Sequence, residues 1–203
     1  GKSVLLKLCC GLLKPQTGRV LVDGQSIPDL NGPALAEMRG RIGMAFQNSA
    51  LFDFMTVGEN IAFPLRQLGT IEPQEIESRI SHVLEQVSLR GIEGLAPSDL
   101  SGGMRKRVCL ARAVIHRPTY LLCDDPTAGL DPVTASRIFR MVNTLRREQN
   151  ATVIVVSHDT NGLFSFCDYT ALLENQRLSF FGPTTDALGH PKVRRFVHGH
   201  AHE

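Results

Sequence analysis

Apolar and polar residues alternate along this chain with two different periods. The helical period is clearest over 73–89, where one stripe is apolar, formed by Ile76, Ile80, Val83, Leu84 and Val87. Short apolar runs of strand length occur at 120–123 and 151–156, and we expect both to be strands buried in a sheet. Helical stripes mixed with buried strands predict an α/β fold.

Further segments extend this pattern. Turn residues between short apolar runs predict hairpins over 20–27 and 170–181, and another strand is expected over 41–46. Near the end, two short helices precede histidines that we expect to fray rather than to bind metal, namely His198, His200 and His202. Capping and breaking residues predict additional helices over 1–13, 31–38, 56–68, 101–117 and 132–149.

Composition and charge narrow the class of protein. At 203 residues with 42% hydrophobic content, the chain can bury one sizeable core. Its net charge of +2 gives no electrostatic reason to expect nucleic acid as a partner. No apolar run approaches the roughly 20 residues of a membrane span. The cysteines lie in apolar stretches without metal-ligand spacing, which indicates buried free thiols at Cys9, Cys10, Cys109, Cys123 and Cys167.

Candidate chemistry concentrates in 100–131, which reads LSGGMRKRVCLARAVIHRPTYLLCDDPTAGLD. Ser101 precedes two glycines at a helix start, where free backbone N–H groups can face an anion. The strand at 120–123 runs into Asp124 and Asp125, which places two carboxylates at the edge of a sheet where α/β folds bind ligands. One carboxylate can hold Mg²⁺ and the next can orient a water. Taken alone, the two features are also typical of a loop and of a solvated turn.

A phosphate-binding motif stands at the start of the chain. Gly1-Lys2-Ser3 is the last third of the pattern G-x-x-x-x-G-K-[ST], and it runs directly into a helical segment. The tripeptide by itself occurs by chance. Its combination, in order, with LSGGM, LLCDDP, AGLD and SHD is far more specific.

This ordered set resembles the nucleotide-binding subunit of ABC transporters, over essentially the whole chain. Within that family the chain looks most like the ATPase of the Mla-type (MCE-linked) phospholipid transporters. The residues behind this narrower resemblance are FQNSALFDFMTVGENIAFPLR (46–66), Met104 where most relatives carry Gln, and HPKVRRFVHG at the end of the chain.

The resemblance implies a P-loop NTPase-type α/β fold, with a mainly parallel sheet flanked by helices, a helical lobe and an antiparallel β element. The chain would form a single nucleotide-binding domain. Residues 1–47 and 118–182 would make its ATPase core, 48–117 its helical lobe and 183–203 a C-terminal tail.

The resemblance also implies sites for ATP and Mg²⁺. One subunit would contact ATP through Gly1, Lys2, Ser3 and Val4. Across a head-to-tail homodimer, the other subunit would contact the same ATP through Ser101, Gly102, Gly103 and Asp131. The metal ligands would be Ser3, Gln47 and Asp124, and the catalytic residues would be Asp125, His158 and Gln47.

The implied partners follow from the same family. Residues 46–66 would face a short helix of a membrane permease, although an apolar cluster in a loop can also be core filler. An MCE-type lipid-binding protein and a small regulatory subunit are further expected partners. The subunit would lie peripherally on the cytoplasmic face of the inner membrane.

Two departures from the family pattern leave alternatives open. Relatives carry Glu where this chain has Asp125, so slow hydrolysis is expected. Five of the eight phosphate-loop positions lie before Gly1, so we expect a fragment or a truncated gene product that binds ATP poorly. The alternatives are the ATPase of another solute transporter, a soluble ATPase of chromosome maintenance or translation, and an inactive remnant.

Overall fold

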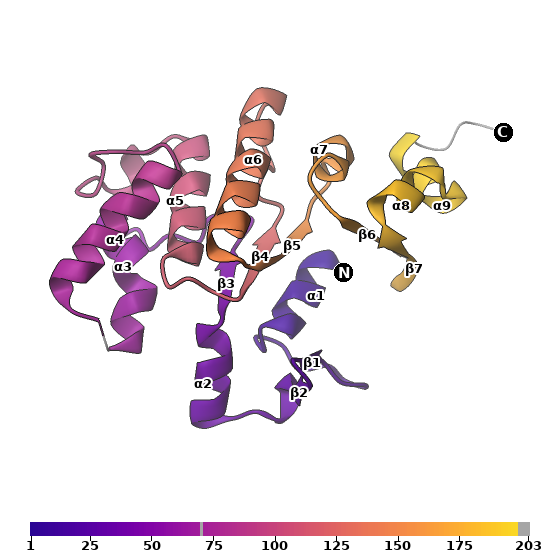
Figure 1. The fold of residues 1–203 in the computed structure, drawn as a ribbon, viewed down its shortest axis with the longest axis horizontal. Coiled ribbons are helices and arrows are strands. Elements are labelled where there is room, and N and C mark those ends of the chain that lie inside the picture. The colour runs from indigo at the N-terminus through magenta and orange to yellow at the C-terminus, as the bar shows by residue number, and fades with distance from the viewer. Residues whose placement is uncertain (70, 199–203) are drawn as a thin grey trace.

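The computed structural model describes residues 1–69 and 71–198, and it confirms the predicted α/β class (Figure 1). Three parallel strands lie at its centre in the order β3 (Ile42–Ala45), β4 (Tyr120–Asp124) and β5 (Thr152–Val156). Leu122 in the middle of β4 pairs with Met44 on one side and Ile154 on the other. Both crossovers between these strands contain helices, as parallel pairing requires.

Successive side chains of β4 point to opposite faces of the sheet, so they pack into two different apolar clusters. Leu122 lies against α1 (Lys2–Cys9), where it forms a small cluster with Leu6 and Cys10. Leu121 and Cys123 belong instead to the larger core that includes α5 (Gly102–Val114) and α6 (Pro132–Gln149). Asp124 follows Leu122 by two residues, so its side chain points to the same face of the sheet, the one covered by α1.

Gly43 in β3 allows α5 to approach the sheet closely. A Cβ atom at this position would lie only 2.0 Å from the carbonyl oxygen of Ala113 in α5. No side chain can be accommodated at that distance without moving the helix. The start of β3 and the end of α5 are therefore in backbone contact.

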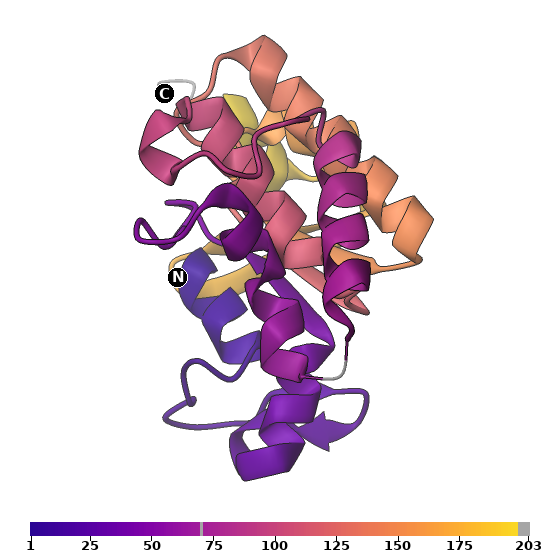
Figure 2. The same cartoon turned by 90° about the vertical axis from the view of Figure 1, so that its left-hand side faces the viewer.

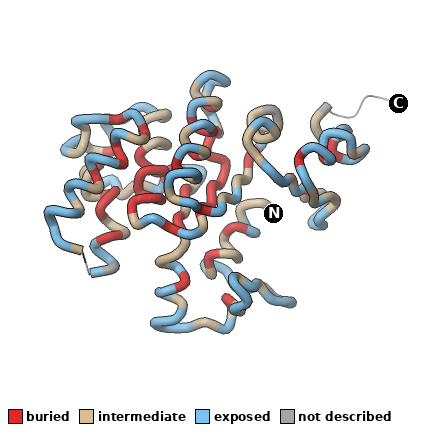
Figure 3. The backbone as a smooth tube through the Cα atoms, viewed as in Figure 1, coloured by how far each residue is buried: buried red, intermediate tan, exposed pale blue. Residues whose placement is uncertain are grey.

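The helical lobe packs α3 (Val57–Leu68) and α4 (Pro73–Gln86) against α5, and Figure 2 looks onto this lobe. A capping box defines the start of α3: Thr56 Oγ1 accepts from the Glu59 N–H at 3.2 Å, and the Glu59 carboxylate accepts from the Thr56 N–H at 2.8 Å. Figure 3 shows that buried residues concentrate here and around the sheet. The lobe and the sheet therefore share one core.

The remaining elements lie around this core. A third apolar cluster, between the β6–β7 hairpin and the last two helices, is formed by Leu172, Ala187 and Val193. In chain order these elements are β1 (Leu21–Val22), β2 (Gln25–Ser26), η1 (Ile27–Asp29), α2 (Gly32–Gly40), η2 (Pro97–Asp99), α7 (Thr160–Phe164), β6 (Tyr169–Glu174), β7 (Arg177–Pro183), α8 (Thr184–Gly189) and α9 (Pro191–His198).

Most predicted elements occur within a few residues of their expected bounds, with two corrections. The expectation that the strand at 151–156 is buried is wrong, because β5 forms one edge of the sheet and leaves Ile154 41% exposed. The short helix α7 has no apolar stripe and was not predicted; it begins where the Asp159 carboxylate accepts from the Gly162 N–H at 3.0 Å. His200 and His202 lie outside the described residues.

All five cysteines are free, and only Cys10, Cys109 and Cys123 are buried. Cys9 and Cys167 are half-buried, so the prediction of buried thiols is correct for three of the five. Burial raises the pKa of each of these thiols, which favours the unreactive protonated form. Within residues 1–69 and 71–198, none of the helices is long and apolar enough to cross a membrane.

Candidate functional site

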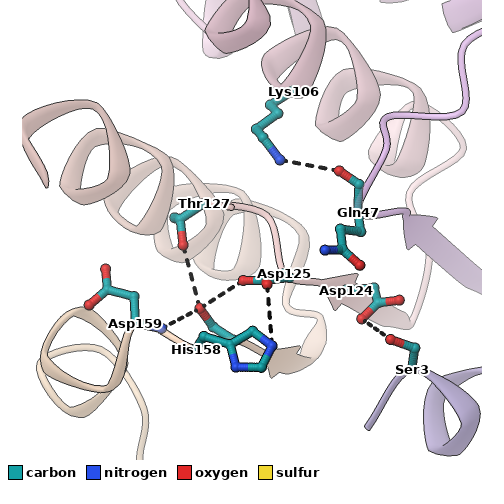
Figure 4. A network of polar contacts seen from close by, with 9 residues as sticks. Ser3, Gln47, Lys106, Asp124, Asp125, Thr127, His158 and Asp159 are labelled. Carbon is teal, nitrogen blue, oxygen red and sulfur yellow. Dashed lines mark hydrogen bonds and ion pairs between the residues drawn. The ribbon is translucent and has the colours of Figure 1, made fainter. Parts of the chain in front are cut away.

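Ser3 and Asp124 meet where the start of α1 faces the end of β4. The Ser3 hydroxyl donates to Oδ1 of Asp124 at 2.8 Å, across 121 residues of sequence (Figure 4). Asp124 is only 5% exposed. A buried carboxylate needs a polar partner. Because Asp124 points to the face of the sheet that α1 covers, the Ser3 hydroxyl is within reach and serves as that partner.

This pair fits the ligand chemistry of Mg²⁺. Magnesium in proteins is held by one or two carboxylate or hydroxyl oxygens together with water and phosphate oxygens. Ser3 and Asp124 supply one oxygen of each kind within hydrogen-bond distance. We find no cluster of three His, Cys, Asp or Glu side chains in the described part of the chain, so an all-protein metal cage is not what this site resembles.

The first turn of α1 is open to an anion. Gly1 is its N-cap, and no side chain in the described residues caps it. The first N–H groups of a helix lack partners within the helix, and the helix dipole favours negative charge there. Lys2 and Ser3 are half-buried in this turn and Val4 is exposed. Phosphate oxygens beside Ser3 would therefore meet backbone N–H groups and an ammonium group.

Asp125 faces away from Ser3, toward the loop after β5. Its Oδ1 accepts from the Ser157 hydroxyl at 3.2 Å, and its Oδ2 lies 3.8 Å from Nε2 of His158, too far for a hydrogen bond (Figure 4). Asp125 is 6% exposed, whereas the His158 side chain is 71% exposed. The backbone of Asp125 has φ of 47°, in the left-handed region that costs a non-glycine residue about 1 kcal/mol or more.

Gln47 follows β3, and its side chain is directed toward the end of β4 (Figure 4). The backbone carbonyl oxygen of Gln47 accepts from the ammonium group of Lys106 in α5 at 3.2 Å. Burial lowers the pKa of Lys106, and the negative charge of Asp125 opposes this effect. Lys106 therefore adds a positive charge to the neighbourhood of the two aspartates.

The other predicted site residues lie in a second group. Ser101 caps α5 by accepting from the Met104 N–H at 3.3 Å, and Asp131 caps α6 by accepting from Val133 and Thr134 N–H groups at 3.0 Å. Hydrogen bonds around Thr134 lower the pKa of Asp131. Gly103 is the neighbour of Thr134, so the two helix starts are adjacent.

Ser101, Gly102 and Asp131 are exposed. In the described part of the chain, no hydrogen bond or ion pair joins residues 101–103 or Asp131 to residues 1–4. The structure therefore brings Ser3, Gln47, Asp124, Asp125 and His158 together, and leaves the second group on a separate exposed edge.

Three functional candidates were missed by sequence reasoning. Ser157 and Thr127 are buried beside Asp125, and Lys106 binds the Gln47 carbonyl. Ser157 had a signal, since it precedes His158 in the SHD motif. Lys106 and Thr127 had none, because each acquires its neighbour only through packing of distant segments.

A groove of about 650 Å³ lies beside the loop that bears Gln47, between α2, β3, α3 and α5. Its lining includes Met44, Phe46, Phe52, Phe63, Arg112 and His116. The ring centroids of Phe52 and Phe63 are 5.0 Å apart. Phe54 is 81% exposed, so the apolar cluster of this loop is only partly packed into the core.

Comparisons with known proteins give a consistent result. A family model described as ABC transporter matches residues 1–128. The methionine import ATP-binding protein MetN of Xanthomonas euvesicatoria is 38% identical over 200 residues, which are 97% of this chain and 59% of that protein. The probable ribonucleotide transport ATP-binding protein mkl of Mycobacterium leprae is 38% identical over 98% of this chain and 58% of that protein. The chain thus spans about three fifths of the length of these relatives.

Solved structures agree. The ATP-binding cassette MJ0796, in a dimeric post-hydrolysis state bound to ADP and Pi, superposes with a TM-score of 0.82 at 31% identity, covering 91% of this chain and 81% of that one. The cbiO1 protein of Clostridium perfringens, part of the transporter complex cbiONQ, superposes with a TM-score of 0.83 at 28% identity over 99% of this chain and 80% of that one.

Proposed function

Because the chain belongs to the ABC transporter family, we propose that it is the ATP-binding and ATP-hydrolysing part of such a transporter. The observation that carries the proposal is the 2.8 Å contact between Ser3 and Asp124, which joins the phosphate-loop helix to the carboxyl end of β4. ATP and Mg²⁺ are the proposed ligands. The first turn of α1 fits the phosphates and the Ser3–Asp124 pair fits the metal.

Each residue of the first group has a proposed role. The N–H groups of Gly1, Lys2, Ser3 and Val4 and the Lys2 ammonium bind the phosphates. Ser3, Asp124 and Gln47 would hold Mg²⁺, which would supply positive charge that neutralises the phosphates. Asp125 and His158 lie on the other side of Asp124 from Ser3 (Figure 4) and are proposed to act in hydrolysis. Asp125 and Gln47 orient the attacking water, and His158 donates to the γ-phosphate.

A homodimer would complete the site. Ser101, Gly102, Gly103 and Asp131 lie on an exposed edge and leave the helix start of α5 accessible. We place them against ATP bound to the partner subunit, so that the nucleotide joins two copies head to tail. MJ0796 is described as a dimer, which supports this arrangement for a protein of the same fold.

The groove beside Gln47 is the proposed docking surface for a membrane permease. The exposed Phe54 and the apolar lining favour docking over core filling. The subunit would then lie peripherally on the cytoplasmic face of the inner membrane, and the Gln47 loop would pass the nucleotide state to the permease.

Phospholipid is the proposed substrate class, on the resemblance of 46–66, Met104 and 190–199 to the Mla-type ATPases. That resemblance also makes an MCE-type lipid-binding protein and a small regulatory subunit the expected partners. The relatives MetN and mkl are named for methionine import and ribonucleotide transport, so those solutes are the alternatives. Phospholipid that co-purifies with the assembled transporter and stimulates its ATP turnover is the expected result. Stimulation by methionine or a ribonucleotide instead would favour an alternative.

ATP binding and turnover by the full-length protein test the core of the proposal. Lys2→Ala should abolish turnover, whereas Lys192→Ala, on exposed α9, should leave it unchanged. Equal turnover in both variants would contradict the assignment of Lys2. Bound ATP without any turnover in the parent would favour the alternative of a remnant, for which Asp125 is the expected cause.

A further inference from the structure

A cluster of two buried hydroxyl groups, those of Ser157 and Thr127, lies next to the carboxylate of Asp125. Thr127 is 5% exposed, Ser157 is 9% exposed and Asp125 itself is 6% exposed. Thr127 belongs to the turn after β4, and Ser157 follows the last residue of β5. The cluster therefore joins the carboxyl ends of two adjacent strands, at the centre of the proposed site.

The hydrogen bonds of Ser157 fix the direction of its proton. Its oxygen accepts from the Asp159 N–H at 3.0 Å. It also lies 3.4 Å from the Thr127 hydroxyl, and 3.2 Å from Oδ1 of Asp125. An ionised carboxylate can only accept, so Ser157 donates its single proton to Asp125. Thr127 must then donate to Ser157, and the chain of donors runs from Thr127 through Ser157 to Asp125.

The backbone beside this carboxylate is held by the same strand. The Asp125 N–H donates to the carbonyl of Val156 at 2.7 Å, one residue before Ser157. The left-handed φ of Asp125 persists because its surroundings hold it. With the backbone fixed in this way, the side-chain torsion is what remains to be set, and the Ser157 hydroxyl sets it. One carboxylate oxygen is occupied and Oδ2 is left on the His158 side.

We propose that Ser157 is a positioning residue for ATP hydrolysis, which holds the Asp125 carboxylate in its productive orientation with Thr127 as its support. This inference rests on the proposed ATPase function. In that reaction the attacking water forms a bond to the γ-phosphorus and gives its proton to Asp125. The bond from the γ-phosphorus to the bridging oxygen breaks, and ADP and phosphate leave. A carboxylate on a short side chain depends on such fixing, because a misplacement of about 1 Å costs about 10²-fold in rate.

Four variants of the full-length protein test this role: Ser157→Ala, Ser157→Thr, Asp125→Asn and the double variant Ser157→Ala/Asp125→Asn. Ser179→Ala is the matched control, since the Ser179 hydroxyl also donates to a carboxylate, that of Glu174 at 3.3 Å, on a peripheral hairpin. Ser157→Ala should lower kcat by about 10-fold or more, the size of one hydrogen bond to a charged group, while ATP affinity stays within about twofold. Ser157→Thr should restore most of the rate, and Ser179→Ala should match the parent.

The double variant decides between positioning and a merely structural role. In the Asp125→Asn background, Ser157→Ala should cause no further loss, because the residue acts through that carboxylate. An equal loss in both backgrounds, unchanged turnover in Ser157→Ala, or a parallel loss of ATP affinity would overturn the inference. If the parent binds ATP without hydrolysing it, the proposed ATPase function fails and this inference fails with it. If the parent hydrolyses ATP and Ser157→Ala does so equally well, only this inference fails.

Discussion

Arg112 offers the sharpest test of how the loop after β3 is held. Its guanidinium donates to the carbonyl of Ala50 at 2.7 Å and to the carbonyl of Ser49 at 2.9 Å. It also lies over the ring of Phe52, 5.7 Å from the centroid. Arg112 is 8% exposed, and Ser49 and Ala50 both have left-handed φ values of 59° and 45°. The strained turn therefore depends on a buried arginine.

The size of the effect follows from these contacts. Each hydrogen bond to a charged group contributes about 1.5–3 kcal/mol, so Arg112→Ala should destabilise the loop by roughly 3–6 kcal/mol. Two carbonyls lose their donor, and a buried cavity replaces the long side chain. Arg112→Lys keeps the charge but not the planar fork, so it should recover only part of the loss.

Amide hydrogen exchange over 46–55, with the urea midpoint of the whole protein, measures this effect. The control is Arg107→Ala, because Arg107 also donates to two carbonyls, those of Val87 at 3.2 Å and Ser88 at 3.0 Å, from the same helix. It is less buried and lies away from the loop, so its loss should leave exchange over 46–55 unchanged. If amides 46–55 exchange as slowly in Arg112→Ala as in the parent, the contacts of Arg112 with the Ser49 and Ala50 carbonyls are not what holds this loop.

Three further predictions concern the sheet, the catalytic centre and pH. Gly43→Ala should lower the free energy of unfolding by roughly 1–3 kcal/mol or more in urea titrations, because its Cβ would meet the Ala113 carbonyl oxygen at 2.0 Å, whereas Gly94→Ala, with no atom within 4 Å, should not. Asp125→Glu should raise ATP turnover by about 10-fold or more if the short side chain limits the reaction, and equal rates would refute that reasoning. Burial lowers the pKa of His116, so the imidazole is protonated more readily in the unfolded chain than in the folded one, and the free energy of unfolding should fall as pH drops below about 6.5. If the urea midpoint of a His116→Phe variant falls by the same amount over this pH range, His116 is not the group responsible.

Much of the fold was predictable because its signals are local. The stripe from Ile76 to Val87 specifies a helix over about three turns of sequence, and the cap at Ser101 specifies a helix start within about one turn. The partial exposure of β5 was not predictable in this way. Its apolar run looks like a central strand, but burial depends on what pairs with each edge, and in the described chain only β4 does.

The candidate site also combines features with a local sequence signal and features that depend on distant segments. Motifs predicted Ser3, Asp124, Asp125 and His158 as candidates from their residue types and order, and the structure places these residues near one another (Figure 4). Motifs could not show that Asp125 turns toward Ser157, since this follows from the register of β4 against β5 and from a left-handed backbone angle. Nor could they identify Lys106, whose partner is a backbone carbonyl 59 residues away.

Side chains of α5 contact the loop that follows β3 at three places. Lys106, Cys109 and Arg112 are spaced by three residues along this helix, and they reach the carbonyls of Gln47, Phe46 and the Ser49–Ala50 turn respectively. The same helix is capped by Ser101, on the exposed edge that we propose to face the partner's nucleotide. A displacement of α5 must therefore carry the 46–50 loop with it or break these donors one after another. Phe46 and Ala50 of this loop also line the groove, so direct contacts of α5 reach from the exposed helix start at Ser101 to the loop that bears Gln47 and borders the groove.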